Sequence, residues 1–298
     1  MYFATYKYKE EENYGILNYE KNGIIPMELL LSKLNRKAPE NLRVFVEEAD
    51  DLLIQALYDV LSKHIFKSIP IGDVTLCAPI PYPTRNLMCL GKNYLEHVKE
   101  VKEFSATTND LPEYPIYFNK TAYPAIGDQD IIKSHSMLTE EIDYEVELAV
   151  VIGKEGKNID ASNIEAHIFG YTIVNDISAR DIQSRHEQWF KGKSLETFCP
   201  MGPYLVHKSA ILNPSDLKLT CHVNGELRQC SNTKHMIFDI PYIISDLSKG
   251  MTLRAGDIIL TGTPSGVGLG FNPPQYLKSG DTVVCHIDKI GYLTNTIK

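Results

Sequence analysis

The segment at residues 142–152 constrains the fold more than any other part of this chain. It reads Ile-Asp-Tyr-Glu-Val-Glu-Leu-Ala-Val-Val-Ile, a β-favouring apolar run that carries carboxylates at Glu145 and Glu147. Because residues two apart on a strand point to the same face, both carboxylates aim at one spot while Val146 faces the other way. If that face is buried, the pair needs a cation or hydrogen-bond donors, and a divalent metal ion would suit it. The alternative is the solvated face of an edge strand, and Glu-x-Glu alone leaves both interpretations open.

Length and composition set the broad class. The 298 residues suffice for one large domain or two, and 43% hydrophobic with 23% charged residues is ordinary globular composition. A net charge of -8 argues against nucleic-acid binding, which favours a basic face. No apolar run reaches transmembrane length, and the N-terminus lacks a signal-peptide layout. We therefore expect a soluble, cytoplasmic protein that binds neither nucleic acid nor a membrane.

The cysteines show no Cys-x-x-Cys spacing and are scattered through apolar segments. They are Cys77, Cys89, Cys199, Cys221, Cys230 and Cys285. This distribution indicates reduced core residues and makes a thiolate zinc site a poor hypothesis.

The chain divides into two predicted domains. Residues 1–77 form a small N-terminal unit in which strand patterns at 2–8 and 14–18 precede one amphipathic helix, with apolar residues at Val46, Ala49, Leu53, Leu57, Val60 and Leu61. Three prolines within 79–83 prevent both helix and ladder pairing and mark the boundary. Residues 78–298 contain many strand patterns, few helical ones and frequent turn signals, which predicts a β-rich α+β domain.

A possible acid–base pair follows the strand pattern at 86–90. On a helix, His97 and Glu100 are three apart and share a face, so an imidazole and a carboxylate would be adjacent. Such a pair can act as a base and the group that orients it, although a surface ion pair fits the same spacing. The polar stretch 105–113 that follows is typical of a mobile lid hinge.

A second cluster of polar residues follows the strand pattern at 169–174. Asp176 lies in the predicted strand-to-helix turn, where many folds hold ligands, and Ser178 with Asp181 matches a capping box. Arg180 and Gln183 would share one face of the next helix, and an arginine in a first turn suits a substrate carboxylate.

Residues 261–268, Thr-Gly-Thr-Pro-Ser-Gly-Val-Gly, superficially match a phosphate-binding loop. They lack the Gly-Lys-Ser/Thr ending, and no helical pattern follows, so nucleotide binding is not expected.

Taken in order, these motifs resemble the fumarylacetoacetate hydrolase family across residues 78–298. The segments that carry the resemblance are residues 91–94 with His97 and Glu100, and residues 143–149, 175–181, 192–194 and 261–268. The N-terminal unit is also similar to one carried by a bacterial subgroup whose members include oxaloacetate decarboxylases.

The resemblance implies a roll of mixed β-sheets around a central site. Glu145, Glu147 and Asp176 would hold Mg²⁺ or Mn²⁺, hard cations that prefer oxygen ligands. His97 and Glu100 would activate water or handle a proton, with Lys193 as a third catalytic group. The predicted substrate contacts are Arg180, Gln183, Lys120 and Thr263. A homodimer is expected from the resemblance alone.

The implied chemistry passes through the enolate of a small 2-oxo acid, whose oxygen a divalent cation stabilises. Cleavage of a C–C bond in such an acid is the leading hypothesis, with oxaloacetate decarboxylation first and acylpyruvate hydrolysis close behind. Isomerase or hydratase activity of the 5-carboxymethyl-2-hydroxymuconate or 2-oxopent-4-enoate type is the alternative. A third hypothesis is a non-catalytic metal-binding or regulatory protein. The site residues alone do not decide among these reactions.

Overall fold

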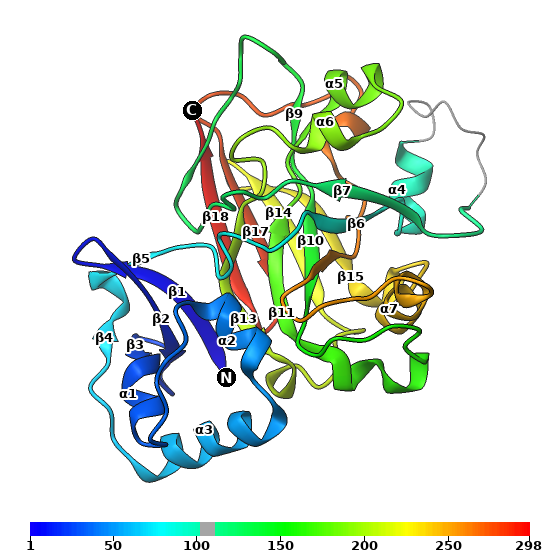
Figure 1. The fold of residues 1–298 in the computed structure, drawn as a ribbon. Helices are drawn as coiled ribbons and strands as arrows, with labels where there is room; N and C mark the ends of the chain where they lie inside the picture. The colour runs from blue at the N-terminus through cyan, green and yellow to red at the C-terminus, as the bar shows by residue number, and fades with distance from the viewer. Residues whose placement is uncertain (102–110) are drawn as a thin grey trace.

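A large mixed sheet dominates the computed structural model, which describes residues 1–101 and 111–298 (Figure 1). Its strands follow one another in the order β4 (Ile69–Pro70), β3 (Gly23–Pro26), β2 (Glu11–Leu17), β1 (Tyr2–Tyr8), β13 (Met201–His207), β11 (Ile168–Asn175), β10 (Val146–Ile152), β16 (Ile258–Leu260), β6 (Leu87–Gly91) and β7 (Ile116–Lys120), while β5 (Thr75–Leu76) pairs with β1. A second sheet has the order β15 (Glu226–Asn232), β14 (Lys218–Val223), β17 (Thr282–Ile287), β18 (Gly291–Ile297) and β8 (Ile131–Ile132). The short strands β12 (Ser178–Ala179) and β9 (Ile142–Asp143) form a separate pair.

The helices are short and lie around these sheets. They are α1 (Met27–Ser32), α2 (Leu42–Glu48), α3 (Asp51–Lys63), α4 (Leu95–Glu100), α5 (Arg180–Arg185), α6 (Phe190–Lys193) and α7 (Ile240–Ser248). None of the helices in the described ranges is long and apolar enough to cross a bilayer. The predicted β-rich α+β class is confirmed.

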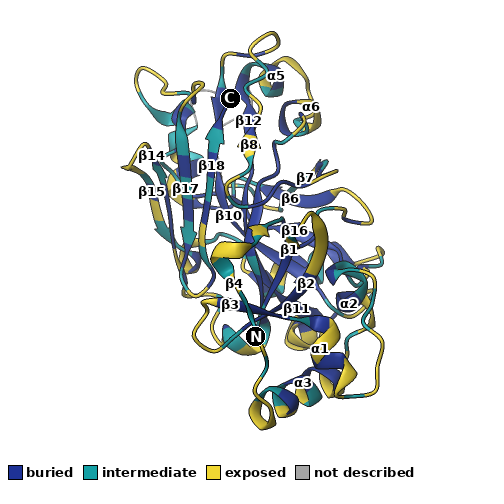
Figure 2. Ribbon diagram, turned by 90° about the vertical axis from the view of Figure 1, so that its left-hand side faces the viewer, coloured by how far each residue is buried: buried dark blue, intermediate teal, exposed yellow. Residues whose placement is uncertain are grey.

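The central strands β10 and β11 are buried along their whole length, as Figure 2 shows. One face of this part of the sheet packs against the five-stranded sheet and α7, and the other packs against α1, α2 and α3. A strand covered on both faces has no solvent side, which explains why the run after Glu147 is continuously apolar rather than alternating.

The N-terminal segment is joined to the rest through the large sheet. Strand β1 pairs antiparallel with β13, with Phe3 opposite Leu205. The first 77 residues therefore extend the same sheet that carries β10 and β11. The domain boundary at residues 77 and 78 remains a prediction.

Two predicted elements are interrupted in the structure. The single helix expected over residues 46–61 is wrong, because α2 ends at Glu48 and α3 begins after Asp50. The side chain of Asp50 accepts a hydrogen bond from the backbone amide of Leu53, so this residue caps a new helix instead of continuing the old one. Similarly, the strand expected over 142–152 breaks at Tyr144 and Glu145, between β9 and β10.

All six cysteines are free thiols. The expectation of core positions is confirmed for Cys89, Cys199, Cys221 and Cys285, whereas Cys77 is half-buried and Cys230 is exposed. Cys230 lies on β15, the edge strand of the five-stranded sheet, so one of its faces meets solvent.

Three aromatic rings connect the N-terminal helices to the large sheet. Phe45 on α2 lies 5.5 Å from Phe3 on β1 and 6.4 Å from Phe169 on β11, measured between ring centroids.

We expect Phe45→Ala to lower the free energy of unfolding by about 3–5 kcal/mol, because Phe45 is fully buried and its removal leaves a cavity. Urea unfolding followed by circular dichroism measures this loss. The control is Leu52→Ala on α3, whose side chain is 80% exposed and whose loss should cost less than about 0.5 kcal/mol. Equal effects of the two substitutions would contradict the packing described here.

Candidate active site

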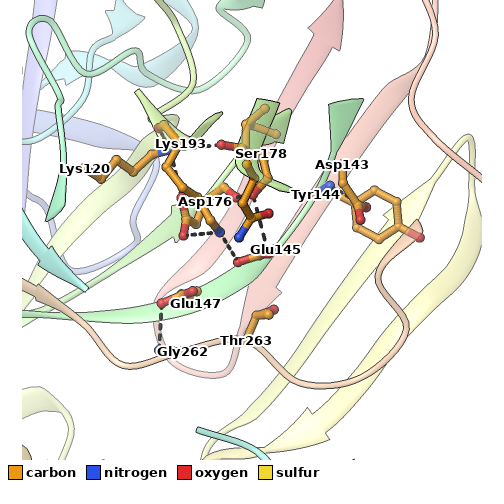
Figure 3. A network of polar contacts seen from close by, with 12 residues as sticks. Lys120, Asp143, Tyr144, Glu145, Glu147, Asp176, Ser178, Lys193, Gly262 and Thr263 are labelled. Atoms are coloured by element: carbon orange, nitrogen blue, oxygen red, sulfur yellow. Dashed lines mark hydrogen bonds and ion pairs between the residues drawn. The ribbon is translucent and has the colours of Figure 1, made fainter. Parts of the chain in front are cut away.

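Three carboxylates converge where β10 begins and β11 ends. Strand pairing sets Val146 opposite Asn175, and the backbone amide of Asp176 donates to the carbonyl of Glu145 over 2.8 Å. As a result Glu145, Glu147 and Asp176 each offer one oxygen within 4.8 Å of the others, and all three residues are buried (Figure 3). The convergence predicted for Glu145 and Glu147 is confirmed, although Glu145 itself lies just before β10.

Lysine side chains bridge and support two of these carboxylates. The Nζ atom of Lys193, in α6, lies 2.7 Å from Glu145 Oε2 and 2.7 Å from Asp176 Oδ2 (Figure 3). Lys120, at the end of β7, places its Nζ 2.8 Å from Asp176 Oδ1 and also donates to the carbonyls of Ile177 and Lys193. Asp176 Oδ1 makes this ion pair but no hydrogen bond in the described chain.

Arg180 supplies the third cation from the start of α5. Its Nε donates to Asp143 Oδ2 over 2.8 Å, and its Nη1 lies 2.7 Å from Glu145 Oε1 and 3.0 Å from Gln183 Oε1. Asp143 also accepts from the backbone amides of Tyr144, Gly268 and Leu269. Asp143 is therefore a fixed anchor that orients the guanidinium.

The electrostatic environment separates Glu145 from Glu147. Burial opposes ionisation of Glu145, but the charges of Lys193, Arg180 and His97 outweigh it and lower the pKa of this carboxyl to about 2. Burial and the charges of Asp176 and Glu145 raise the pKa of Glu147 well above its usual range, against the opposing effect of Lys193. Glu147 takes part in none of the ion pairs between described residues, and the backbone amide of Gly262 donates to its Oε2 over 2.7 Å.

This arrangement fits a bound divalent cation. Four buried carboxylates, those of Asp143, Glu145, Glu147 and Asp176, meet three cations from Lys120, Arg180 and Lys193, so negative charge remains in excess. The carboxylate that has no ion-pair partner among the described residues is Glu147, a member of the ligand cluster itself. An all-oxygen donor set with excess negative charge is what Mg²⁺ or Mn²⁺ requires.

The structure brings His97 and Glu100 together as predicted. They lie on α4, with Nδ1 of His97 3.1 Å from Oε2 of Glu100. His97 is buried, and the loop whose Gly262 amide donates to Glu147 also donates from Gly266 to Glu100, so one segment of backbone connects the pair to the carboxylates. Residues 105–110 of the predicted lid hinge lie outside the described residues.

Of the four predicted substrate contacts, Arg180 is the best placed. Its Nη2 is buried and makes no hydrogen bond within the described ranges, so it can receive a ligand. Gln183 lies beside it, with its Oε1 held by Arg180 and its side chain half-buried.

Lys120 and Thr263 have their polar groups occupied by the protein. Lys120 is fully buried behind Asp176, with the carbonyl and carboxylate partners described above. The hydroxyl of Thr263 donates to the carbonyl of Val146 and accepts from Gln229. These contacts favour a supporting role for both side chains over direct contact with substrate.

Several residues of the site carry no local signal in the sequence. Gln229, from β15, is fully buried and accepts from the amide of Val146 while donating to Thr263 and to the carbonyl of Pro264. Trp189, which precedes α6, packs edge-on against Phe118, and Lys193 Nζ lies 5.2 Å from the centre of the Phe118 ring. The one available signal for Trp189 is that it is the chain's single tryptophan, whereas Gln229 resembles any polar residue of a strand.

The capping box predicted for Ser178 is wrong. Helix α5 begins at Arg180 after Ala179, and no side chain caps it. The hydroxyl of Ser178 instead donates to the carbonyl of Asp176 and lies 3.4 Å from Glu145 Oε1. Ser178 therefore stabilises the turn that presents Asp176.

Comparisons with known proteins agree with this geometry. A model of the family described as fumarylacetoacetate (FAA) hydrolase, C-terminal, matches residues 86–298. Oxaloacetate tautomerase YisK of Bacillus subtilis (strain 168) is 56% identical over 227 residues, which cover 76% of this chain and 74% of that protein.

Solved structures share the whole fold. A fumarylacetoacetate hydrolase from the psychrophilic Exiguobacterium antarcticum has a TM-score of 0.83 at 35% identity, covering 100% of this chain and 99% of that one. Maleylpyruvate hydrolase from Sphingobium sp. SYK-6, solved with manganese(II) and pyruvate, has a TM-score of 0.77 at 25% identity, covering 100% and 98%.

We expect Glu147→Gln to weaken Mn²⁺ binding at least about tenfold. Glu147 is the proposed metal ligand that makes no ion pair with a described lysine or arginine, and glutamine cannot supply its negative charge to the metal. The metal-free variant should melt at the same temperature as the wild type, since the raised pKa of Glu147 already favours its neutral form, which glutamine resembles. Isothermal titration with Mn²⁺ and thermal melts measure the two effects. Glu155→Gln, an exposed position, is the matched control. Unchanged Mn²⁺ affinity in Glu147→Gln would contradict the assignment.

Proposed function

The chain belongs to the fumarylacetoacetate hydrolase family, and we propose that it is a divalent-metal-dependent enzyme that interconverts the keto and enol forms of oxaloacetate or a closely similar 2-oxo acid. The observation that carries this proposal is the His97–Glu100 pair on α4, which one loop connects to the carboxylate cluster: Gly266 donates to Glu100 and Gly262 donates to Glu147. The similarity to an oxaloacetate tautomerase supports it. Cytoplasmic location remains a prediction.

Glu145, Glu147 and Asp176 would hold the metal, and the manganese in the maleylpyruvate hydrolase structure supports this assignment. When bound, a divalent cation stabilises negative charge on an enolate oxygen. Lys193 contributes a permanent positive charge beside it. Burial disfavours the charged form, but Asp176 and Glu145 outweigh burial and raise the pKa of Lys193. Lys193 therefore acts through its charge and not as a general base.

Keto–enol interconversion moves one proton between C3 and the 2-oxo oxygen of the substrate. Glu100 is suited to hold that proton, because its carboxylate is fixed by His97 at Oε2 and by the backbone amide of Gly266 at Oε1. Since Nδ1 of His97 faces Glu100, Nε2 is the nitrogen that can face a ligand. The pair thus supplies a proton acceptor and a polar partner side by side.

Arg180 would bind a carboxylate of the substrate. Its Nε and Nη1 are fixed by Asp143, Glu145 and Gln183, so Nη2 is held ready without a partner among the described residues. A buried guanidinium with an unused donor favours an anionic ligand, because it would otherwise carry the cost of desolvation.

Cleavage of a C–C bond, the reaction favoured by the sequence, is the second candidate. The similarity to the maleylpyruvate hydrolase supports it, and a water placed beside Glu100 would turn the same site to hydrolysis. Decarboxylation needs the same enolate stabilisation but no proton transfer from C3. The choice among these reactions rests on product analysis.

With Mn²⁺ or Mg²⁺ present, we expect the protein to accelerate the loss of enol oxaloacetate, followed by its ultraviolet absorbance, above the spontaneous rate. Pyruvate, followed with lactate dehydrogenase and NADH, should form no faster than in the absence of protein. Pyruvate formation would favour the decarboxylase instead, and release of a carboxylic acid from an acylpyruvate would favour the hydrolase. Tight binding of a 2-oxo acid without turnover of any of them would favour a non-catalytic role.

We expect Glu100→Gln to keep Mn²⁺ affinity within about twofold of the wild type but to lower turnover about 10²–10⁴-fold, because a neutral amide cannot accept the proton. Steady-state kinetics and Mn²⁺ titration on the same preparations measure the two quantities. Glu96→Gln, on the exposed face of α4, is the control and should retain full activity. A fully active Glu100→Gln enzyme would refute the assignment of Glu100.

A further inference from the structure

We propose that the loop at residues 261–270 is the positioning element that fixes Glu100 relative to the metal ligands, and that Gly270 is the position that makes this possible. The inference rests on the proposed function, in which Glu100 handles the substrate proton. It assigns a role to a glycine-rich segment whose sequence only superficially matches a phosphate-binding loop.

The backbone amides of this loop bind three acidic side chains of the site. Gly262 donates to Glu147 over 2.7 Å, a contact visible in Figure 3, and Gly266 donates to Glu100 Oε1 over 2.7 Å. Gly268 and Leu269 donate to the two oxygens of Asp143 over 2.6 Å and 3.0 Å. One short segment of backbone thus contacts a metal ligand, the acid–base pair and the anchor of Arg180.

The same loop holds α4 at both of its ends. Before the helix, the side-chain amide of Asn93 donates to the carbonyls of Thr261 and Phe238. At its last residue, Glu100 accepts from Gly266. Because α4 is a six-residue helix without a side-chain N-cap, these external contacts determine where it lies.

Two glycines make the contact with Glu100 sterically possible. At Gly270, an added Cβ would lie 2.3 Å from both Cδ and Oε1 of Glu100, inside contact distance. At Gly266, φ is +100° and an added Cβ would lie 2.0 Å from the carbonyl oxygen of Arg228, so its amide reaches Glu100 only from a backbone that favours glycine.

Gly270 offers a selective way to test the contact. The atoms that a Cβ would meet belong to the flexible end of the Glu100 side chain and not to backbone, so the carboxylate can move away while the fold persists. Gly270→Ala should therefore displace Glu100 without altering its chemistry. Gly72→Ala is the matched control, because Gly72 also lies in a 3-10 helix and an added Cβ there meets nothing within 4 Å.

We expect Gly270→Ala to lower kcat for enol–keto conversion about 10–100-fold, the usual cost of a catalytic group misplaced by about 1 Å. Mn²⁺ affinity should stay within about twofold, and Gly72→Ala should match the wild type in both measurements. In the Glu100→Gln background, adding Gly270→Ala should change kcat less than about twofold, because the group it displaces is already inactive. Wild-type turnover in Gly270→Ala would overturn the inference. So would a loss of kcat in the Glu100→Gln background as large as the loss that Gly270→Ala causes in the wild type.

A second readout separates this inference from the proposed function. If the wild-type protein does not act on oxaloacetate, the function fails, but the contact is still tested by hydrogen exchange of the α4 amides with Mn²⁺ bound. Exchange at Val98 and Val101, whose amides donate to the carbonyls of Tyr94 and His97 at the two ends of α4, should accelerate at least about tenfold in Gly270→Ala and not in Gly72→Ala. Equal exchange in the two variants would show that the loop does not position α4.

Discussion

The desolvation of three neighbouring carboxylates is the constraint on which the site depends. Moving one unpaired carboxylate out of water costs roughly several kcal/mol, and here Glu145, Glu147 and Asp176 share one buried spot. Their compensation comes from Lys120 on β7, Arg180 on α5 and Lys193 on α6. Because these cations come from separate elements, the sheet and the short helices beside it must assemble before the free-energy cost of burying the three carboxylates is offset. A bound divalent cation would complete the compensation at Glu147.

Local patterns in the sequence predict the parts of the site that are themselves local. Glu145 and Glu147 are two apart, and His97 and Glu100 are three apart, so strand and helix geometry places each pair. Contacts between distant segments cannot be obtained in this way. Gln229 reaches the amide of Val146 from 83 residues away. The sequence predicts substrate contacts for Lys120 and Thr263 but gives no sign that their polar groups also have partners within the protein. Ser178 matched a capping pattern, but its hydroxyl serves the turn at Asp176.

The fold and the proposed metal ligands suit an enolate intermediate, but they do not determine which reaction proceeds through it. A tautomerase and a maleylpyruvate hydrolase are both similar to this chain, so a shared fold does not by itself decide the reaction. What separates them is whether a water reaches the substrate and where the proton goes. Under the proposed function those two choices would depend on how α4 is held, because α4 carries both His97 and Glu100.

The pairing of β1 with β13 has a practical consequence for dissecting the molecule. The match to the family begins at residue 86, which suggests a natural fragment boundary. In such a fragment β13 would lose its neighbour and become an edge strand, with unpaired amide and carbonyl groups beside the apolar surface that Phe3 and Phe45 normally cover. Exposed edges of this kind recruit other chains. Pairing with β1 thus removes this free edge from β13 in the full chain.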